Sequence, residues 1–452
     1  MSVEELVRAT LDRTARFDRQ LNSYITVAGD QALDAARHAD DELRRGVDRG
    51  PLHGIPVSVK DHIDTAGIPT SAGSKALAGR IPATDAPVVR RLKDAGAIVI
   101  GKANMNQFAG GESGWNPDYG KMPNPRFPEF SVGGSSGGSA SHVAAGLVPL
   151  SIGSDNGGSI RIPAALCGVV GLKPTFGRVS TDGVAPRSFS TEHVGPIGRC
   201  VDDVALALEA ISGHVAGSRS THRKPVPPYA EDTAGVTGLR IGVDRNYNAL
   251  GDPAVIKGFA GALQVLESLG CSIQPITMPA SDNIFQVGNV IFQPEISIWF
   301  DAIGRERADL AGIRNAMVLG AAISAMDYLR ANQRRREIQI DFAKQIRDVD
   351  VVASPTYFLA RRPFPSDANM GLGGYPDLGT YRPAETDGLR YTLPFNVLGL
   401  PAISVPCAIG DDGTVGFQVV ARAWDEPTVL RVAREYERAT AWHTRHPKPF
   451  DE

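Results

Sequence analysis

Two glycine- and serine-rich turns contain the residues of this chain best suited to chemistry. Gly-Gly-Ser-Ser-Gly-Gly-Ser occupies residues 133–139 and Gly-Ser-Asp-Asn-Gly-Gly-Ser occupies residues 153–159. A serine hydroxyl becomes a nucleophile when a base takes its proton and donors receive the charge that develops on the attacked carbonyl. Glycine allows positive φ and close backbone approach, so a Gly-Gly step before serine can aim several N–H groups at one point. The turns therefore supply candidate hydroxyls and candidate oxyanion donors.

The candidate base is Lys60, which lies in Val-Ser-Val-Lys-Asp at residues 57–61. A single lysine is normally a solvated surface charge. The alternating apolar pattern around Lys60 instead predicts a buried strand, and burial disfavours the charged ammonium and lowers the pKa. A lysine that is neutral near pH 7 can accept a proton.

Two alternative interpretations of the glycine turns are less consistent with the sequence. Gly/Ser-rich segments are often flexible linkers, but the segment 142–152 that follows the first turn is apolar, as expected of a buried helix and strand. Phosphate-binding loops follow the patterns G-x-x-x-x-G-K-[ST] or G-x-G-x-x-G, and neither turn fits them. The sequence therefore favours catalytic turns.

Composition predicts a cytoplasmic enzyme. The chain has 452 residues, 42% of them hydrophobic, and a formal net charge of −3, with a pI near 6.3. This balance gives no electrostatic footprint for nucleic acid or an anionic membrane, and no apolar run of eighteen residues predicts a membrane span. The beginning of the chain lacks a basic segment followed by an apolar one, so no signal peptide is predicted. Four singly placed cysteines predict reduced thiols: Cys167, Cys200, Cys271 and Cys407.

The sequence predicts neither a metal site nor a cofactor. Its nine histidines form no H-E-x-x-H motif and its cysteines no C-x-x-C motif. Asp61-His-Ile-Asp64 could ligate a metal in principle, but a structural role is favoured. A Ser-His-Asp triad remains an alternative, because its members meet only in space.

Strands and helices alternate along the chain, which predicts an α/β fold. We expect a large, mixed, mostly parallel central sheet covered by helices on both faces. Residues 213–238 are the least regular stretch and are expected to form a surface connection within one compact fold. The expected strands are 55–60, 97–101, 147–152, 239–243, 349–353 and 402–405, and the expected helices include 3–16, 30–45, 86–95, 201–211, 253–269 and 327–346.

Several ordered motifs together resemble the amidase signature family of serine hydrolases. The resemblance implies the amidase signature fold in a single domain over residues 1–452, with its core signature at about 50–210. The motifs that carry it are Gly54–Asp61, Gly101–Asn106, Gly133–Ser139, Gly153–Pro163, Gly168–Arg178, Asp350–Thr356, Leu393–Pro406 and Gly416–Ala421.

Matching these motifs position by position implies a Ser-Ser-Lys triad. Ser159 falls at the position of the nucleophile, Lys60 at that of the lysine, and Ser135 at that of the bridging serine, which in the family follows a cis peptide bond. The implied oxyanion donors are the backbone N–H groups of Asn156, Gly157, Gly158 and Ser159, and the implied supporting side chains are those of Ser136, Ser154, Asp155 and Arg161.

Substrate selectivity should reside in two variable regions, at about 279–328 and 357–391. Phe285, Phe292 and Trp299 recur every seven residues, and they either line a slot for an aryl or alkyl acyl group or belong to ordinary core. Arg335 falls where resemblance to the glutaminase-type subunit of tRNA-dependent amidotransferases would place a carboxylate-binding arginine. The alternative for its Arg-Arg-Arg run is a solvated helix face.

Three functions are compatible with these residues. The favoured one is an amidase that hydrolyses a small or medium carboxamide to carboxylate and ammonia; it would act on a small-molecule amide, and a homodimer is a candidate assembly. The second is the amidotransferase subunit, which would serve a partner protein. The segment 188–196 departs from that subunit's Ser-x-Asp-Gln type sequence, which favours the first. The third is a non-catalytic relative that binds or scaffolds, which the presence of all three triad residues disfavours.

Overall fold

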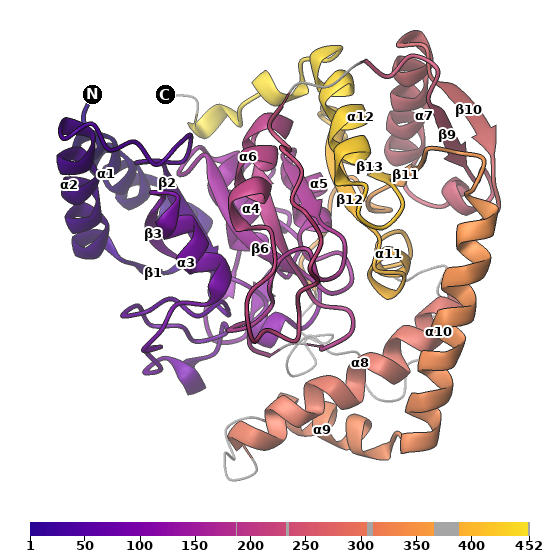
Figure 1. The fold of residues 1–452 in the computed structure, drawn as a ribbon, viewed down its shortest axis with the longest axis horizontal. Coiled ribbons are helices and arrows are strands. Elements are labelled where there is room, and N and C mark those ends of the chain that lie inside the picture. Colours follow the sequence, from indigo (N-terminus) through magenta and orange to yellow (C-terminus); the bar gives the residue numbers. More distant parts are fainter. Residues whose placement is uncertain (187, 232–234, 305–310, 366–387, 451–452) are drawn as a thin grey trace.

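A large mixed sheet runs through the middle of the molecule (Figure 1). The computed structural model describes residues 1–186, 188–231, 235–304, 311–365 and 388–450. Within them, eleven strands pair in the order β1-β3-β2-β6-β8-β7-β12-β13-β11-β9-β10. Their bounds are β1 Tyr24–Val27, β2 Pro56–Lys60, β3 Ile98–Ala103, β6 Leu150–Asp155, β7 Val170–Lys173, β8 His193–Gly198, β9 Arg240–Val243, β10 Ser272–Pro275, β11 Val351–Pro355, β12 Ala402–Gly410 and β13 Gly413–Val420, while β4 Trp115–Asn116 and β5 Gly120–Lys121 form a separate ribbon.

This sheet has two parallel blocks on either side of an antiparallel centre, and its edge strand β1 is antiparallel to β3. The strands β3-β2-β6 and β11-β9-β10 pair in parallel. The other six neighbouring pairs among the described strands are antiparallel. A helical crossover returns the chain in the same direction, as between β2 and β3, whereas a tight turn reverses it, as between β12 and β13. The predicted large mixed sheet is confirmed. The alternation of strands and helices along the chain explains only the parallel parts of this sheet.

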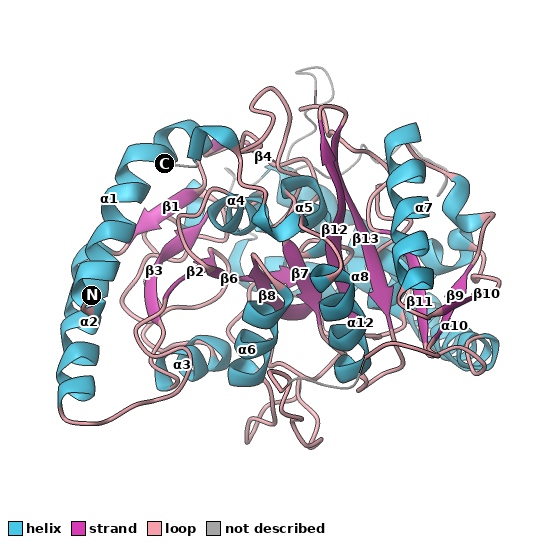
Figure 2. Ribbon diagram, turned by 90° about the horizontal axis from the view of Figure 1, so that it is seen from above, coloured by secondary structure: helices cyan, strands magenta, loops and turns pink. Residues whose placement is uncertain are grey.

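Helices cover both faces of the sheet, as predicted (Figure 2). Helices α3, α6, α7 and α12 share one apolar cluster with the sheet, and α4 and α5 pack into another. The helix bounds are α1 Val3–Leu21, α2 Gly29–Arg44, α3 Pro87–Asp94, α4 Gly137–Ala144, α5 Arg161–Cys167, α6 Val201–Ile211, α7 Pro253–Ser268, α8 Ser281–Gly304, α9 Ala311–Ala322, α10 Ala325–Gln345, α11 Leu393–Val397 and α12 Glu426–Arg438.

Side-chain caps mark where several of these helices begin. Ser2 precedes α1 and forms a reciprocal capping box with Glu5. Ser324 precedes α10, and its hydroxyl accepts the backbone N–H of Asp327 at 3.1 Å. Asp425 accepts the backbone N–H of Thr428 at the start of α12. Such caps contribute about 0.5–2 kcal/mol each, so local sequence sets these helix starts.

Helices α8, α9 and α10 pack on one another and lie along the lower and right-hand border of the molecule in Figure 1. Pro294 stands inside α8. We call α8, α9 and α10 the helical arm. Apolar side chains of α8 and α10 share a core cluster with α11, and this cluster joins the helical arm to the rest of the fold.

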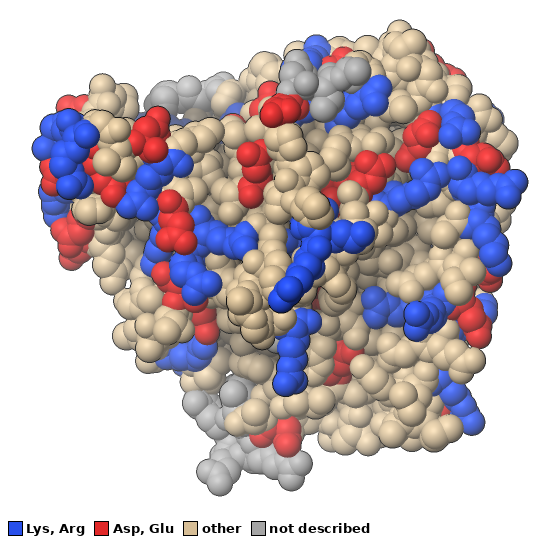
Figure 3. Space-filling model, viewed as in Figure 1, with Lys and Arg blue, Asp and Glu red and all other residues tan. Residues whose placement is uncertain are grey.

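The predictions from composition concern the surface charge, membrane-spanning helices and the state of the cysteines. On the face shown in Figure 3, acidic and basic side chains are interspersed over the surface. Among the described residues, no helix combines the length and the apolar character needed to span a membrane. All four cysteines are free thiols; Cys200 is half-buried and the other three are buried. In residues 213–238 the described positions contain neither helix nor strand.

Candidate active site

Alternation along β2 directs Lys60 toward the same face of the sheet as α4. Val57 and Val59 point into the apolar cluster beneath α3 and α6. Side chains alternate between the faces of a strand, so Ser58 and Lys60 point to the opposite side. Accordingly, the Ser58 hydroxyl lies 2.9 Å from Nδ1 of His142 on α4.

Lys60 makes two hydrogen bonds with serine hydroxyls. Its Nζ lies 2.7 Å from the Oγ of Ser135 and 3.0 Å from the Oγ of Ser154. All three side chains are buried. The expected pairing of Lys60 with Ser135 is therefore present in the structure.

Burial lowers the pKa of Lys60 from its usual value near 10.5 to about 7, against the opposing influence of the carboxylates of Glu192 and Asp155. Removing an ammonium group from water disfavours its charged form. A large neutral fraction is thus present near neutral pH, as a proton acceptor requires.

The two glycine turns lie side by side. The peptide bond between Gly134 and Ser135 is cis, as the resemblance implies. The backbone N–H of Ser136 donates to the carbonyl of Ser159 at 3.1 Å, and its hydroxyl donates to the carbonyl of Ser154. These bonds connect the Ser135 turn directly to the Ser159 turn.

Ser159 is more accessible than the groups beneath it. It is half-buried, whereas Lys60 and Ser135 have no exposed surface. Ser159 stands between β6 and α5, immediately after Gly158, whose φ is +133°. A Cβ on Gly158 would lie 2.3 Å from Oγ1 of Thr392, so this turn requires glycine.

A buried ion pair holds the nucleophile turn from below. The guanidinium of Arg161 donates to both carboxylate oxygens of Asp155 at 3.0 Å, and neither side chain is exposed. Burial by itself would raise the pKa of Asp155, but Arg161 and Lys173 hold it well below its usual value. Asp155 is therefore a permanent anion that organises the turn.

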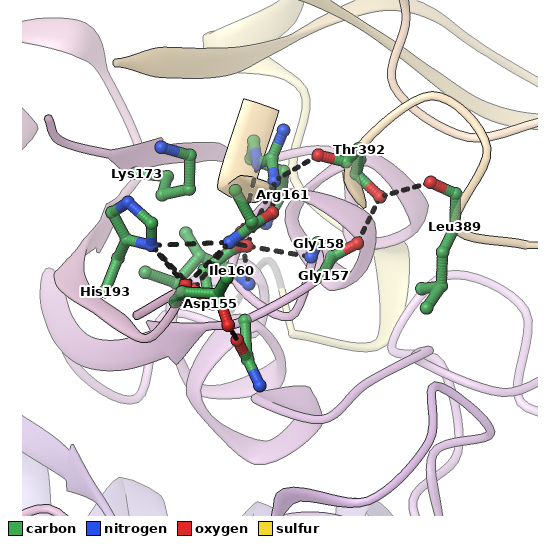
Figure 4. Close-up of polar contacts among 12 residues, drawn as sticks. Asp155, Gly157, Gly158, Ile160, Arg161, Lys173, His193, Leu389 and Thr392 are labelled. Carbon is green, nitrogen blue, oxygen red and sulfur yellow. Dashed lines mark hydrogen bonds and ion pairs between the residues drawn. The ribbon is translucent and has the colours of Figure 1, made fainter. Parts of the chain in front are cut away.

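The Asp155 carboxylate also accepts a hydrogen bond from one of the expected oxyanion donors. The backbone N–H of Gly158 donates to Oδ1 of Asp155 at 2.8 Å, as drawn in Figure 4. This differs from the expectation that Gly158 contributes to the oxyanion hole. The physical reason is that the buried carboxylate needs donors of its own. Of the four expected donors, Asn156, Gly157 and Ser159 are left for a developing oxyanion.

Three polar residues from the carboxy-terminal part support this turn and were not assigned roles from the sequence. Asn396 on α11 donates to Asp155, Gln418 on β13 accepts from Arg161 at 2.8 Å, and the Thr392 hydroxyl donates to the carbonyl of Gly157. Figure 4 shows Thr392 above the glycine pair. A signal was available, because Asn396 and Gln418 stand within motifs that are otherwise apolar.

His193 lies beside this turn but is not arranged as a catalytic base. Its Nδ1 is 2.7 Å from the carbonyl of Thr191 and 3.2 Å from that of Asp155. Burial, reinforced by Lys173, keeps its pKa well below 6.5. This geometry favours Lys60 as the base.

The two aspartates considered as metal ligands have structural partners. Asp61 accepts hydrogen bonds from Ser71 and Gly73, and Asp64 forms an ion pair with Arg80. Among the described residues, no three histidine, cysteine or acidic side chains are grouped to hold a metal ion.

The aromatic residues predicted to line one slot divide between two clusters. Phe285 packs against the cluster of α8, α10 and α11. Phe292 and Trp299 pack against a second cluster that contains Phe108. Phe108 follows closely after Asn106, whose N–H donates to the carbonyl of Ser135 at 3.2 Å. All three remain predicted substrate contacts, but Phe285 packs against a different cluster from Phe292 and Trp299.

Arg335 binds the protein's own backbone. Its Nε donates to the carbonyl of Val397 at 2.6 Å and its Nη2 to the carbonyl of Ser190 at 2.9 Å. With these donors engaged, the geometry favours a role in holding the chain over the expected clamp on a substrate carboxylate.

Comparison with known proteins shows which family the chain belongs to. A family model described as Amidase matches residues 5–430. The chain is 38% identical to a glutamyl-tRNA(Gln) amidotransferase subunit of Chloroflexus aggregans, over 99% of this chain and 95% of that protein. It is 40% identical to an amidase of Pseudomonas putida, with the same coverage of both. Native peptide amidase from Stenotrophomonas maltophilia superposes with a TM-score of 0.85 at 33% identity, over 100% of this chain and 96% of that one.

The fold and the matches define a hydrolase that acts on amide C–N bonds. The chain belongs to the amidase signature family. Because its relatives are named both as amidases and as amidotransferase subunits, the substrate must be inferred from this chain's own residues.

Proposed function

We propose that this protein is an amidase that hydrolyses a small or medium carboxamide to carboxylate and ammonia through an acyl-enzyme on Ser159. The observation that carries the proposal is the buried contact of 2.7 Å between Lys60 and Ser135, on the turn hydrogen-bonded to that of Ser159. The lowered pKa of Lys60 supplies a base at neutral pH.

In the acylation step, the Oγ of Ser159 attacks the amide carbonyl carbon. Its proton passes to Ser135, whose own proton passes to the neutral amine of Lys60. A neutral lysine has two N–H bonds and one lone pair, so it can donate to Ser154 while accepting from Ser135. When the C–N bond breaks, the proton returns through Ser135 to the leaving nitrogen, and ammonia departs.

Deacylation repeats the sequence with water. Lys60, through Ser135, takes a proton from a water molecule that attacks the acyl carbon, and the proton then returns to the Oγ of Ser159. Carboxylate is released and the starting state is restored. In both steps the backbone N–H groups of Asn156, Gly157 and Ser159 would receive the negative charge on the carbonyl oxygen; one such donor is worth about 2.7–4 kcal/mol in another serine hydrolase.

A stand-alone amidase is favoured over the amidotransferase subunit by the environment of Arg335. A glutaminase must recognise the substrate's carboxylate, and the arginine expected to do so donates to the carbonyls of Val397 and Ser190. The subunit remains the second candidate because the Chloroflexus relative carries that name. In the favoured proposal the substrate is a small-molecule amide, and no second kind of chain is required.

Ammonia release by the purified chain tests the proposal. The substrates are aryl and alkyl carboxamides, glutamine and asparagine, and Ser159→Ala is the inactive control. Turnover of an uncharged carboxamide by the lone chain supports the amidase. Glutamine as the best substrate, with turnover only in the presence of a second subunit, would replace it with the amidotransferase function.

A further inference from the structure

Glu295 is a buried carboxylate on α8, in a helix outside the catalytic core. Only 2% of the residue is exposed. It accepts hydrogen bonds from the hydroxyls of Ser188 and Ser190, from the backbone N–H of Ser190 at 3.0 Å, and from the Tyr328 hydroxyl at 2.7 Å. These bonds satisfy the buried carboxylate and tie α8 to residues 188 and 190.

The segment that Glu295 binds, residues 188–191, also contacts the oxyanion turn. The hydroxyls of Ser188 and Thr191 lie 2.8 Å apart, but each has one proton, which Ser188 donates to Glu295 and Thr191 to Asn156, so the backbone of the segment carries the connection. Thr191 in turn donates from Oγ1 to Oδ1 of Asn156. Asn156 is the first of the expected oxyanion donors and, like Ser159, it is half-buried.

The same segment is held from a second helix. Arg335 on α10 donates to the carbonyl of Ser190 at 2.9 Å. The carboxylate of Glu295 on α8 and the guanidinium of Arg335 on α10 thus fix residues 188–191. Both helices follow that segment by about a hundred residues or more in the sequence. This is also the stretch in which the sequence departs from the amidotransferase pattern.

We propose that Glu295 is a positioning residue that holds Asn156, and with it the oxyanion turn, through the 188–191 segment and the Thr191 hydroxyl. The inference rests on the proposed function, because it assigns Asn156 to the oxyanion hole. Glu295 touches neither the substrate nor the reacting atoms. It orders the 188–191 segment, and the Thr191 hydroxyl then fixes the Asn156 side chain and the direction of the N–H groups beside it.

The expected effect falls on the chemical step. Oxyanion donors act on charge that develops in the transition state, so displacing them lowers kcat with little change in KM. A misplacement of about 1 Å can cost about 100-fold in rate. We therefore expect Glu295→Gln, whose amide nitrogen cannot accept the bonds that a carboxylate oxygen does, to lower kcat about 10- to 100-fold.

The test compares Glu295→Gln and Thr191→Val with Glu337→Gln in the full chain. Glu337 is a half-exposed acid on α10 that pairs with Arg334, so its substitution makes the same chemical change on the same arm. Active sites are titrated with a fluorophosphonate, so that kcat is counted per reactive Ser159 and misfolded protein is not scored. Both network variants should lose kcat with nearly unchanged KM, and Glu337→Gln should match the wild type.

A double variant separates positioning from general destabilisation. Because Glu295 and Thr191 act in series on Asn156, Glu295→Gln with Thr191→Val should be no slower than the slower single variant. Wild-type kcat per titrated site in Thr191→Val overturns the positioning role while leaving the amidase function intact, even if Glu295→Gln does not fold. Multiplicative losses in the double variant also overturn it. A wild-type enzyme that releases no ammonia from any amide overturns the function and the inference together.

Discussion

Asn396 donates two hydrogen bonds to Asp155, although 241 residues separate them in the chain. Its Nδ2 lies 2.8 Å from the backbone carbonyl of Asp155 and 2.9 Å from its Oδ1. With Arg161, this contact joins α11, which precedes the last two strands, to the turn that presents Ser159. The geometry of the nucleophile therefore depends on how the last strands dock.

The buried ion pair makes the first prediction. Arg161→Met leaves the Asp155 carboxylate buried and unpaired, which should cost about 3–5 kcal/mol in the free energy of unfolding. Asn396→Ala removes weaker bonds and should cost about 1–3 kcal/mol. Urea denaturation measures both. Arg347→Met, at an exposed pair with Asp348, is the control and should change stability by less than about 1 kcal/mol. Equal losses in Arg161→Met and the control would contradict the assignment.

The second prediction concerns the acylated residue. Treatment with a fluorophosphonate should place one covalent adduct on Ser159, because that hydroxyl is accessible beside the candidate oxyanion donors. Peptide mass spectrometry locates the adduct. Ser159→Ala should remain unlabelled, and Ser135→Ala should be labelled more slowly, because its relay is removed. An adduct on any other serine would show that the nucleophile is misassigned.

The third prediction is a pH profile. Only neutral Lys60 accepts a proton, so kcat/KM should be low below the lysine's pKa, rise through about pH 7 and level off above it. Lys60→Met should lose about 10²–10⁴-fold in activity and lose this rise. Lys75→Met, at an exposed position, is the matched control and should keep the wild-type profile. A rising limb that persists in Lys60→Met would assign the titration to another group.

The fourth prediction tests the crowding around Gly158. Gly158→Ala brings a Cβ to 2.3 Å from Oγ1 of Thr392, and its φ of +133° disfavours any side chain. Gly217 also has a positive φ, of +80°, but no atom lies within 4 Å of the added Cβ. Gly217→Ala should cost about 1–2 kcal/mol in stability and keep its activity. Gly158→Ala should lose activity about 100-fold in initial-rate assays, because displacing the turn by about 1 Å costs about that much in rate. Comparable activity in the two variants would contradict this account of the turn.

The fifth prediction is substrate preference. Uncharged aryl or alkyl carboxamides should show higher kcat/KM than glutamine or asparagine. Phe292 and Trp299 pack in the apolar cluster of Phe108, which follows closely after the residue that hydrogen-bonds to the carbonyl of Ser135. Arg335, in turn, donates to backbone carbonyls. The preference should be broad, since one methylene in an apolar pocket is worth only about 1–3 kcal/mol. Steady-state ammonia assays across the panel measure it.

Arg335→Ala provides the internal control for that preference. If Arg335 holds residues 188–191, its loss should lower kcat/KM for glutamine and for an apolar amide by similar factors. A loss confined to glutamine would instead assign Arg335 to a substrate carboxylate and favour the amidotransferase function.

The sequence by itself determined the elements around the site and the candidates for its chemistry. The alternating pattern around Lys60 predicted a buried strand, and β2 is one. The apolar segment 142–152 predicted a buried helix and strand after the first glycine turn, and α4 and β6 lie there. These features depend on neighbouring residues, whose spacing the sequence displays directly.

The tertiary structure alone decided which partners those candidates have. Asp155 takes the N–H of Gly158 from the oxyanion hole. Glu295 binds Ser188, more than a hundred residues before it in sequence, and Thr191 of the same segment donates to Asn156. Helix periodicity suggested one aromatic slot, but packing assigned Phe285 and Trp299 to different clusters. Such contacts join segments brought together by the sheet order, in which strands distant in sequence become neighbours, and a single sequence records no distance between them.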